Sequence, residues 1–207
     1  MKVFTSIPIR KETSLADSNI TKRALAAALR ELMNEIPFEK ISIAQICEKC
    51  EMNRKSFYYH FKDKYDLVNW IFDTEFIAVA NQNPQDTGWA FLSDLCHYLY
   101  DNRAFYRKAL KISGQNSFSD HFREMLVPIV AQHIQYVISV ESSDVSTRLD
   151  PVVTQQFYVS FITDGIICAI ERWLQDQNCI SADDFILLTH SCISKMAKKV
   201  CLELNTQ

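Results

Sequence analysis

Glycine and proline are scarce in this sequence, which has 3 glycines and 5 prolines among 207 residues. These two residues interrupt helices and build tight turns, so few positions of the chain break a helical pattern. Apolar residues nevertheless make up 48% of the chain, enough for a sizeable core. We therefore expect an all-α globular protein, built as one mid-sized domain or as two small domains that share a long helix.

Long apolar runs are also missing. No stretch approaches the roughly 18 to 20 apolar residues that a membrane-spanning helix needs, and we see no secretory signal segment at the start of the sequence. The 7 cysteines are an odd number, which in the absence of a signal segment indicates reduced thiols. We expect a cytoplasmic protein that does not associate with a membrane.

Sequence motifs of enzyme active sites are absent as well. The sequence has no Gly-rich phosphate loop, no nucleophile elbow and no paired metal motif. His97, His121 and His133 have no carboxylate partner at ligand spacing. Cys47 and Cys50 could suggest zinc, but zinc needs a second pair of ligands and none lies nearby. We expect no catalytic residues, no metal and no cofactor, and we interpret the two cysteines as small buried side chains.

The net charge of −3 conceals an uneven distribution. Residues 1–66 contain 12 Lys or Arg against 9 Asp or Glu, whereas residues 67–207 contain 10 against 16. The first part therefore carries +3 and the second −6. A basic end on an acidic body suits a DNA-binding protein with a separate regulatory part.

Residues 42–64 have the pattern of two short helices joined by a tight turn. Ser42 is a good N-cap for the first helix, because its hydroxyl can accept from a free amide of the first turn. Asn53 is a plausible cap for the second helix, in which Phe57 and Phe61 lie four residues apart and face inward.

The outward positions of the second helix combine cations, hydroxyls and aromatic edges. They are Arg54, Lys55, Ser56, Tyr58, Tyr59 and His60. Arg and Lys can donate to guanine O6 and N7, whereas Tyr, Ser and His can bind phosphates and fix the register on DNA. A helix of this length fits the major groove when its first residues face the bases. For this helix taken alone, an ordinary solvated helix in a bundle is the alternative.

The string NRKSFYYHF at residues 53–61, followed by Lys64, Asp66 and Leu67, resembles the helix-turn-helix signature of the TetR family of transcriptional regulators. The resemblance is strong over residues 21–70 and is nearest to the branch that includes activators of dihydroxyacetone-kinase operons. It implies a three-helix helix-turn-helix head followed by a larger helical regulatory and dimerisation domain, with about nine helices in total.

The family resemblance extends the set of candidate DNA contacts. In the family the start of the first helix touches phosphate, which makes Thr21 a candidate as well as a possible helix cap. The complete set is Thr21, Ser42, Asn53, Arg54, Lys55, Ser56, Tyr58, Tyr59, His60 and Lys64. The family usually has Gly in the turn, where this chain has Glu51. A left-handed conformation costs a non-Gly residue about 1–2 kcal/mol, so we expect either a different turn or strain that the packing tolerates.

These features divide the chain into three parts: a flexible N-terminal arm at 1–18, a helix-turn-helix DNA-binding domain at 19–66, and a helical effector-binding and dimerisation domain at 67–207. Arg10 and Lys11 of the arm could reach a minor groove, and the favoured alternative is an arm that is disordered and has no such function. The helices expected outside the helix-turn-helix are 21–35, capped by Thr21 or Asn19; a long helix from Asp63 to about Ala80; and about 86–101, 103–112, 117–140, 150–177 and 181–204.

Self-association is expected through the last two helices. Residues 152–173 are apolar over most of a helical circumference, and small residues there would let helices approach closely. The resemblance implies a twofold-symmetric homodimer with a four-helix interface. The candidate interface residues are Phe161, Gly165, Ala169, Trp173, Leu188, Cys192 and Met196. The alternative is that these residues complete the core of one chain.

An effector pocket is suggested by aromatic residues interleaved with polar groups in the second domain. The candidates are Trp89, His97, Tyr98, Phe105, Phe122, Tyr136, Tyr158 and Asp164. A helical core built from Phe and Tyr would give the same pattern.

The sequence therefore predicts a regulator that binds a palindromic double-stranded DNA operator as a homodimer and responds to an unknown small-molecule effector. It could be a repressor released by the effector, or an activator working with a protein co-regulator that carries the small molecule. A helical interaction module without DNA binding is the third alternative.

Overall fold

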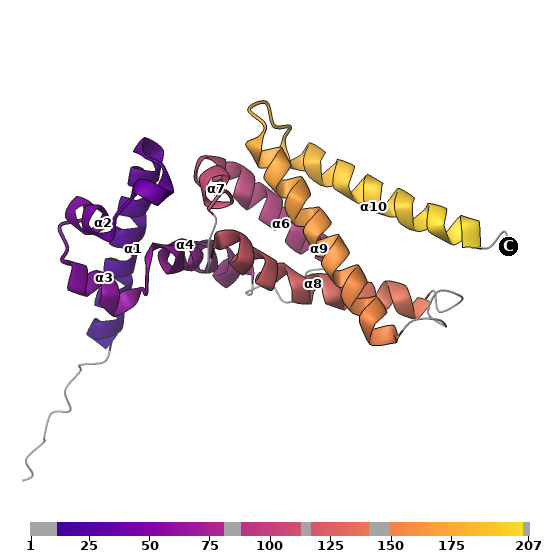
Figure 1. The fold of residues 1–207 in the computed structure, drawn as a ribbon, viewed down its shortest axis with the longest axis horizontal. Coiled ribbons are helices and arrows are strands. Elements are labelled where there is room, and N and C mark those ends of the chain that lie inside the picture. Colours follow the sequence, from indigo (N-terminus) through magenta and orange to yellow (C-terminus); the bar gives the residue numbers. More distant parts are fainter. Residues whose placement is uncertain (1–11, 81–87, 113–116, 141–149, 205–207) are drawn as a thin grey trace, which may run out of the picture. The chain divides into compact units, whose positions relative to one another are not determined.

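The computed structural model describes residues 12–80, 88–112, 117–140 and 150–204. The described part of the chain is helical with no strand, which confirms the predicted all-α class. The chain divides into two compact units, Met1–Ile71 and Phe72–Gln207, and Figure 1 shows the order of their helices. Among the described helices, none combines the length and the apolarity that crossing a bilayer needs.

The first helix of the first unit, α1 (Glu12–Glu35), begins earlier than predicted. Residues 12–18 were expected in a flexible arm, and Thr21 or Asn19 was expected as the helix cap. Both residues instead lie inside α1, because no Gly or Pro between Glu12 and Glu35 ends a helix. Arg10 and Lys11 lie outside the described residues.

The core of the first unit forms where α1 meets the short helices that follow it. Pro37 stops α1, as predicted, and leads into the 3-10 turn η1 (Phe38–Lys40). The helix-turn-helix consists of α2 (Ile43–Lys49) and α3 (Arg54–His60). The buried side chains of this core come from these elements, from the residues that join them and from the next helix, α4 (Lys64–Phe72): Leu25, Leu29, Met33, Phe38, Ile41, Ile46, Phe57, Phe61, Leu67, Val68 and Ile71.

The helix predicted from Asp63 to Ala80 is helical throughout but not α-helical throughout. It consists of α4 (Lys64–Phe72), the π-helical turn η2 (Asp73–Ile77) and α5 (Ala78–Ala80). In η2 the backbone N–H of Ala78 donates to the carbonyl of Asp73, five residues back. Two neighbouring helices bind the wider turn through side chains: His121 Nε2 lies 2.7 Å from Asp73 Oδ1, and the Tyr98 hydroxyl donates to Glu75 at 2.9 Å.

Five further helices are described in the second unit, at nearly the predicted positions. They are α6 (Gly88–Asp101), α7 (Arg103–Ala109), α8 (Phe118–Val140), α9 (Pro151–Gln175) and α10 (Ala182–Leu204). Asp150 caps α9 by accepting from the backbone N–H of Val152 at 2.7 Å, and Pro151 occupies the first turn. Proline suits this position because the first amides of a helix have no intrahelical partner.

Aromatic rings fill the centre of the second unit. Phe72 is fully buried, and the rings around it belong to Phe76, Tyr98, Tyr106, Phe118 and Phe122, with centroid distances from 5.3 to 6.2 Å. Most of these pairs meet edge to face or tilted, the arrangements that ring quadrupoles favour. The cluster joins α4, η2, α6, α7 and α8 into one core.

Candidate DNA-binding surface

The N-cap predicted at Ser42 is present, and the structure adds a capping box with Gln45. The Ser42 hydroxyl accepts from the backbone N–H of Gln45 at 3.2 Å, and the backbone N–H of Ser42 donates to Gln45 Oε1 at 2.9 Å. These reciprocal bonds satisfy two backbone amides that the helix leaves unpaired, and they fix where α2 begins. The Ser42 side chain therefore has a structural role, whether or not it also touches DNA.

The turn between α2 and α3 is a Schellman turn centred on Glu51. Glu51 has φ = +54°, in the left-handed region. The backbone N–H of Met52 donates to the carbonyl of Cys47 at 2.8 Å, and that of Glu51 donates to Glu48 at 3.1 Å. This pair of bonds defines the Schellman motif. Of the two outcomes expected for the non-Gly residue, the structure shows the second: the turn keeps its left-handed residue and the packing tolerates the strain.

Helix α3 separates its buried residues from its exposed ones. Asn53 caps the helix, because its Oδ1 accepts from the backbone N–H of Ser56 at 2.8 Å. Phe57 and Phe61 are buried, as predicted. The outward residues Arg54, Lys55, Tyr58 and Tyr59 are exposed, and Tyr59 has 82% of its surface open to solvent. Cationic and hydroxyl-bearing side chains therefore share one accessible face.

His60 ends α3 and lies beside a cation that the sequence did not single out. Burial lowers the pKa of His60, and the charge of Lys22 on α1 lowers it further. The Lys22 ammonium is 6.0 Å from the centre of the Phe61 ring and 5.8 Å from that of Trp70. Lys22 thus joins the edge of the α3 surface from a distant part of the sequence. No local pattern marks it, because the contact spans about forty positions along the chain.

Lys64, a candidate DNA contact from the sequence, binds backbone carbonyls within the first unit. Its ammonium donates to the carbonyl oxygens of Phe38 at 2.7 Å, Ile41 at 2.8 Å and Glu39 at 3.3 Å, and it lies 4.4 Å from the centre of the Phe38 ring. An ammonium group has three hydrogens, so these acceptors use them all. Burial lowers the pKa of Lys64. We therefore remove Lys64 from the proposed DNA contacts.

The remaining candidates occupy different places. Thr21 is half-buried within α1, so it is not the cap that the sequence predicted. Ser56 is partly buried in the first turn of α3, where its hydroxyl lies 3.3 Å from Asn53 Oδ1. The structure thus brings together Asn53, Arg54, Ser56 and their neighbours on α3, and it places Thr21 on another helix.

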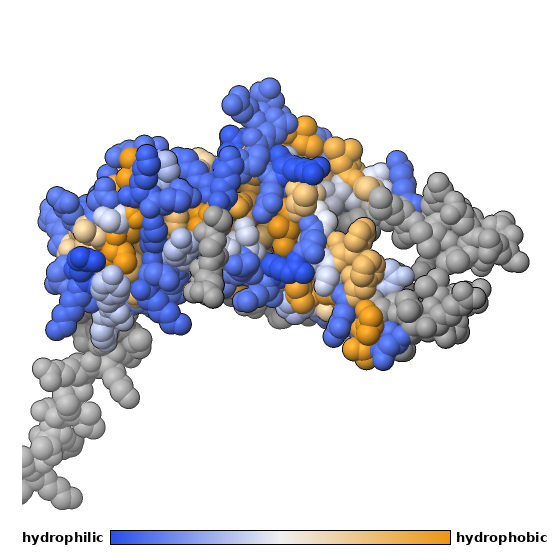
Figure 2. All heavy atoms as spheres, viewed as in Figure 1, coloured by the Kyte–Doolittle hydropathy of each residue, from blue (hydrophilic) through white to orange (hydrophobic). Residues whose placement is uncertain are grey.

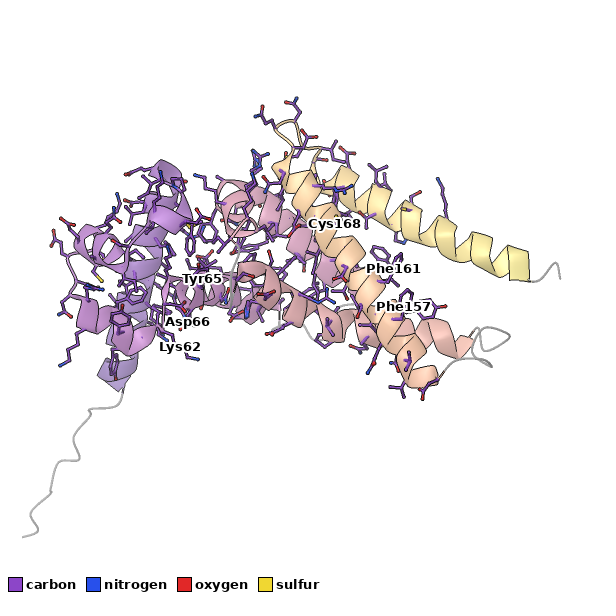
Figure 3. The ribbon with its side chains drawn as sticks, viewed as in Figure 1. Lys62, Tyr65, Asp66, Phe157, Phe161 and Cys168 are labelled. Carbon is purple, nitrogen blue, oxygen red and sulfur yellow. The ribbon has the colours of Figure 1, made fainter. Side chains whose placement is uncertain are left out.

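Side-chain contacts tie the end of α3 to the start of α4, where Figure 3 labels Lys62, Tyr65 and Asp66. Asp63 Oδ1 accepts from the backbone N–H groups of Tyr65 and Asp66, each at 2.8 Å, which caps α4. Asp66 Oδ2 accepts from the backbone N–H of Lys62 at 2.9 Å. The Tyr65 ring meets the Phe38 ring edge-on at 5.1 Å. These contacts hold the end of α3 at a fixed position relative to α4.

Cys47 and Cys50 are packing residues in this structure. Cys47 is buried and Cys50 is half-buried. Burial raises the pKa of each thiol, which disfavours the thiolate that a metal or a redox reaction would require. In the described residues, no cluster of three His, Cys, Asp or Glu side chains could hold a metal ion.

Two family models match the chain. Residues 25–71, the helix-turn-helix and its flanking helices, match the model for bacterial regulatory proteins of the tetR family. Residues 88–195 match a model described as a transcriptional regulator C-terminal region. The chain belongs to the TetR family. TetR-family proteins are transcription regulators, not enzymes.

Individual relatives agree with the TetR assignment. The HTH-type dhaKLM operon transcriptional activator DhaS of Lactococcus lactis subsp. lactis (strain IL1403) is 32% identical over 100 residues, covering 48% of this chain and 54% of the relative. The match therefore spans about half of that relative. Among solved structures, a dihydroxyacetone kinase operon activator DhaS has a TM-score of 0.59 at 20% identity, covering 87% of this chain and 97% of that chain. A TetR regulator from Streptococcus agalactiae 2603V has a TM-score of 0.63 at 18% identity, covering 86% and 96%. These two structures establish a shared fold.

In the second unit, the candidate interface residues divide between surface and core. Phe161, Leu188, Gly165 and Cys192 are exposed, and a Cβ added to Gly165 would meet no atom within 4 Å. Ala169 is half-buried, and the side chain of Met196 lies outside the described part of the chain.

Trp173 does not belong to the predicted interface. It is 6% exposed. Its ring stacks on Phe185 at 4.2 Å and on Tyr100 at 5.7 Å, and its indole N–H donates to the carbonyl of Ile180 at 2.9 Å. Trp173 therefore completes the core of its own chain, which was the alternative left open by the sequence.

The residues proposed for an effector pocket are divided among separate places. Phe105 and Phe122 are buried among other aromatic rings of the core. The Tyr98 hydroxyl lies 2.7 Å from the Tyr106 hydroxyl as well as near Glu75. The others lie elsewhere: Trp89 against His190, His97 against Asp183, Asp164 in an ion pair with Arg123, and Tyr158 exposed on α9. The side chain of Tyr136 lies outside the described part of the chain. The core alternative therefore accounts for Phe105 and Phe122.

Proposed function

We propose that this chain is a transcription regulator that reads operator DNA with α3 and works as a homodimer. The observation that carries the proposal is the exposed face of α3. Arg54 and Lys55 lie in its first turn, where a helix in the major groove meets base edges. Tyr58 and Tyr59 follow with accessible hydroxyls suited to phosphates. In this proposal residues 19–66 bind DNA, residues 67–207 provide regulation and dimerisation, and the protein acts in the cytoplasm.

Lys22 extends the proposed surface beyond the residues identified from the sequence. It lies close enough to His60 to lower the pKa of that imidazole. A lysine beside the end of α3 would meet the phosphate backbone flanking the bases that α3 reads. Such a contact adds affinity without sequence preference.

The homodimer is supported by an apolar surface on α9 that the described part of the chain leaves exposed. One face of α9 packs against α8, where Val130 and Val159 form a buried cluster. The opposite face is open: Phe157 is 64% exposed and Phe161 67% exposed. Figure 2 shows hydrophobic residues gathered over α9, and Figure 3 shows Phe157, Phe161 and Cys168 following one another along it. Contiguous exposed apolar residues mark interaction surfaces.

The exposed side chains of α10 also support the homodimer. Of its side chains that the structure describes, only Ala182 is buried. Leu187 is 67% exposed and Leu188 60% exposed. A helix with so little burial on its own chain gains stability from packing against another molecule. We propose that the exposed faces of α9 and α10 meet their counterparts around a twofold axis, which buries the same surface on both chains.

Dimerisation would set the distance between the two α3 helices that read the operator. Two α3 helices related by a twofold axis would read the half-sites of a palindrome whose centres lie about one helical turn, roughly 34–36 Å, or a multiple of it apart. One short helix alone supplies few base contacts, so pairing is needed for useful affinity and specificity.

Control by an effector is proposed to act through η2. His121 of α8 and Tyr98 of α6 both bind acidic residues of this turn, and η2 continues directly from α4 in the chain. A ligand or protein partner that displaced α6 or α8 would therefore pull on a helix that begins in the first unit. Control requires that the effector prefers one of the two conformations, because equal affinity for both shifts neither.

Activation with a protein co-regulator is the second candidate mode of action. The curated relative is named as an operon activator. Deleting the gene and measuring transcription from the bound promoter separates the alternatives: transcripts fall if the protein activates and rise if it represses.

DNA binding itself is tested by gel-shift with the DNA upstream of the protein's own gene. We expect a discrete complex that a matching unlabelled fragment displaces and random DNA does not. A protein that is folded and dimeric but shows no preference for any fragment of the genome would support the interaction-module alternative instead.

A further inference from the structure

Helix α10 is anchored to its own chain at its N-terminal end. Phe185 stacks on Trp173 of α9, with ring centroids 4.2 Å apart and planes 7° apart. Ser181 Oγ accepts from the backbone N–H of Asp184 at 3.1 Å and caps the helix. Beyond this anchor, Leu187 and Leu188 point away from the chain and are exposed. The anchor therefore decides where α10 presents the apolar residues that we assign to the dimer interface.

One contact in this anchor joins α10 to α6 through an imidazole. His97 Nε2 lies 3.0 Å from Oδ1 of Asp183, in the first turn of α10. On the other side of the ring, His97 Nδ1 lies 2.8 Å from the carbonyl oxygen of Ser93. Both ring nitrogens therefore face oxygen atoms that can only accept. A neutral imidazole has one N–H, so it satisfies one of these acceptors, whereas the imidazolium has two and satisfies both.

The charges around His97 favour the same protonated form. The carbonyl of Ser93 raises the pKa of His97 above 6.5, and Asp183 and Asp101 raise it further, while burial opposes them. Asp183 approaches from α10 and Asp101 from the end of α6. Because the folded pKa is raised, the stability that protonated His97 contributes is fully present below the unfolded pKa and is lost as pH rises through the folded value.

We infer that the packing of α10 against α6 depends on the protonation of His97. As a result, the affinity of the homodimer falls as the pH rises. This inference rests on the proposed dimer of α9 and α10. In the imidazolium form, His97 binds Asp183 and holds α10 in the position that the second copy recognises. When His97 loses its proton, the helix is less well ordered before association, and ordering it then opposes dimerisation.

The size of the effect is limited by solvent. The His97 side chain is 45% exposed and that of Asp183 is 87% exposed, and exposed ion pairs contribute little because water screens them. We expect the dimer dissociation constant to increase about two- to fivefold between about pH 6 and about pH 8, the range in which imidazole titrates.

Analytical ultracentrifugation of the full chain at a series of concentrations and pH values measures this constant. Asp183→Asn and His97→Gln should abolish the pH dependence and leave the dimer near the weaker, high-pH value. Asp184→Asn is the matched control: the Asp184 carboxylate accepts from the Ser181 hydroxyl at 2.7 Å, whereas the His97 contact is with Asp183, and an asparagine oxygen can still accept from Ser181. This variant should retain the pH dependence of the unmodified chain.

His190 of α10 is a second imidazole that contacts α6, with its ring 4.6 Å from that of Trp89. His190→Gln separates its contribution, and we expect this variant to keep most of the pH dependence. A chain that stays monomeric at every pH and concentration would refute the proposed dimer itself. A stable dimer whose dissociation constant is unchanged by pH, or changes equally in Asp183→Asn, would refute the inference about His97 and leave the dimer intact.

Discussion

The ammonium nitrogen of Lys64 lies 2.7 Å from the carbonyl oxygen of Phe38, twenty-six positions earlier in the chain. With Glu39 and Ile41 as further acceptors, it binds carbonyls of η1 and of the residue that follows it, and so ties the start of α4 to the 3-10 turn. In the family signature this lysine is adjacent to the DNA-reading residues, yet here its hydrogens are directed into the protein.

Lys64→Ala should therefore lower the stability of the first unit. The variant leaves carbonyl groups without their charged donor, which typically costs about 1–3 kcal/mol. Thermal unfolding and urea titration, followed by circular dichroism, measure the loss. Lys62→Ala is the matched control, because Lys62 is exposed and only its backbone N–H bonds to Asp66. If Lys64→Ala were fully stable but bound all DNA sequences more weakly, the lysine would contact phosphate after all.

Glu51→Gly should stabilise the first unit. Glycine adopts φ = +54° without the side-chain clash that Glu51 meets, which relieves about 1–2 kcal/mol. Glycine also loses more conformational freedom on folding, which costs about 0.5–1 kcal/mol of stability. We therefore expect a net gain of about 0.5–1 kcal/mol in the free energy of unfolding. Glu48→Gly, inside α2, is the control and should destabilise by a similar amount. A loss of stability in Glu51→Gly would show that the Glu51 side chain makes a compensating contact.

Arg54→Ala and Lys55→Ala should weaken binding to the operator more than binding to random DNA. If either side chain reads a base, its loss costs about 1–3 kcal/mol and relaxes the preferred sequence at one position. Binding titrations with operator and random fragments at several salt concentrations measure both effects. Tyr58→Phe is the comparison, since loss of a phosphate contact should weaken both fragments alike. Equal losses for Arg54→Ala on both fragments would place Arg54 on the backbone instead.

Phe161→Asp should dissociate the homodimer and leave each chain folded. Phe161 is exposed on its own chain, so the substitution removes little from the core, but a charge at a twofold interface meets its own copy. Size-exclusion chromatography with light scattering should show a monomer, and operator affinity should fall with it. Val79→Asp is the control, because Val79 is also an exposed apolar residue but lies on α5. A dimer that persists in Phe161→Asp would locate the interface elsewhere.

Phe57→Ala should unfold the first unit at moderate temperature. Phe57 is fully buried between α3 and the rest of the core, and truncation of a buried Phe costs about 3–5 kcal/mol. Loss of operator binding should follow the loss of helical signal with temperature. A variant with unchanged unfolding and reduced binding would contradict the assignment of Phe57 to the core.

The amino-acid sequence by itself determined the features that depend on short stretches of chain. The cap at Ser42, the cap at Asn53 and the stop at Pro37 each arise from a few adjacent residues, because helix ends are satisfied by side chains within one turn. Periodicity likewise placed α6 to α10 within a few residues of their ends, and the string at residues 53–61 indicated the family.

Only the tertiary structure decided the features in which distant parts of the chain meet. Trp173 could have served the interface or the core, and its stacking on Tyr100 and Phe185 placed it in the core. Lys22 lies near enough to His60 to affect its pKa, and the Lys64 ammonium donates to the carbonyl of Phe38. No local sequence pattern predicts either contact. Periodicity shows that a helix has an apolar face, but what covers that face depends on how the other helices pack against it.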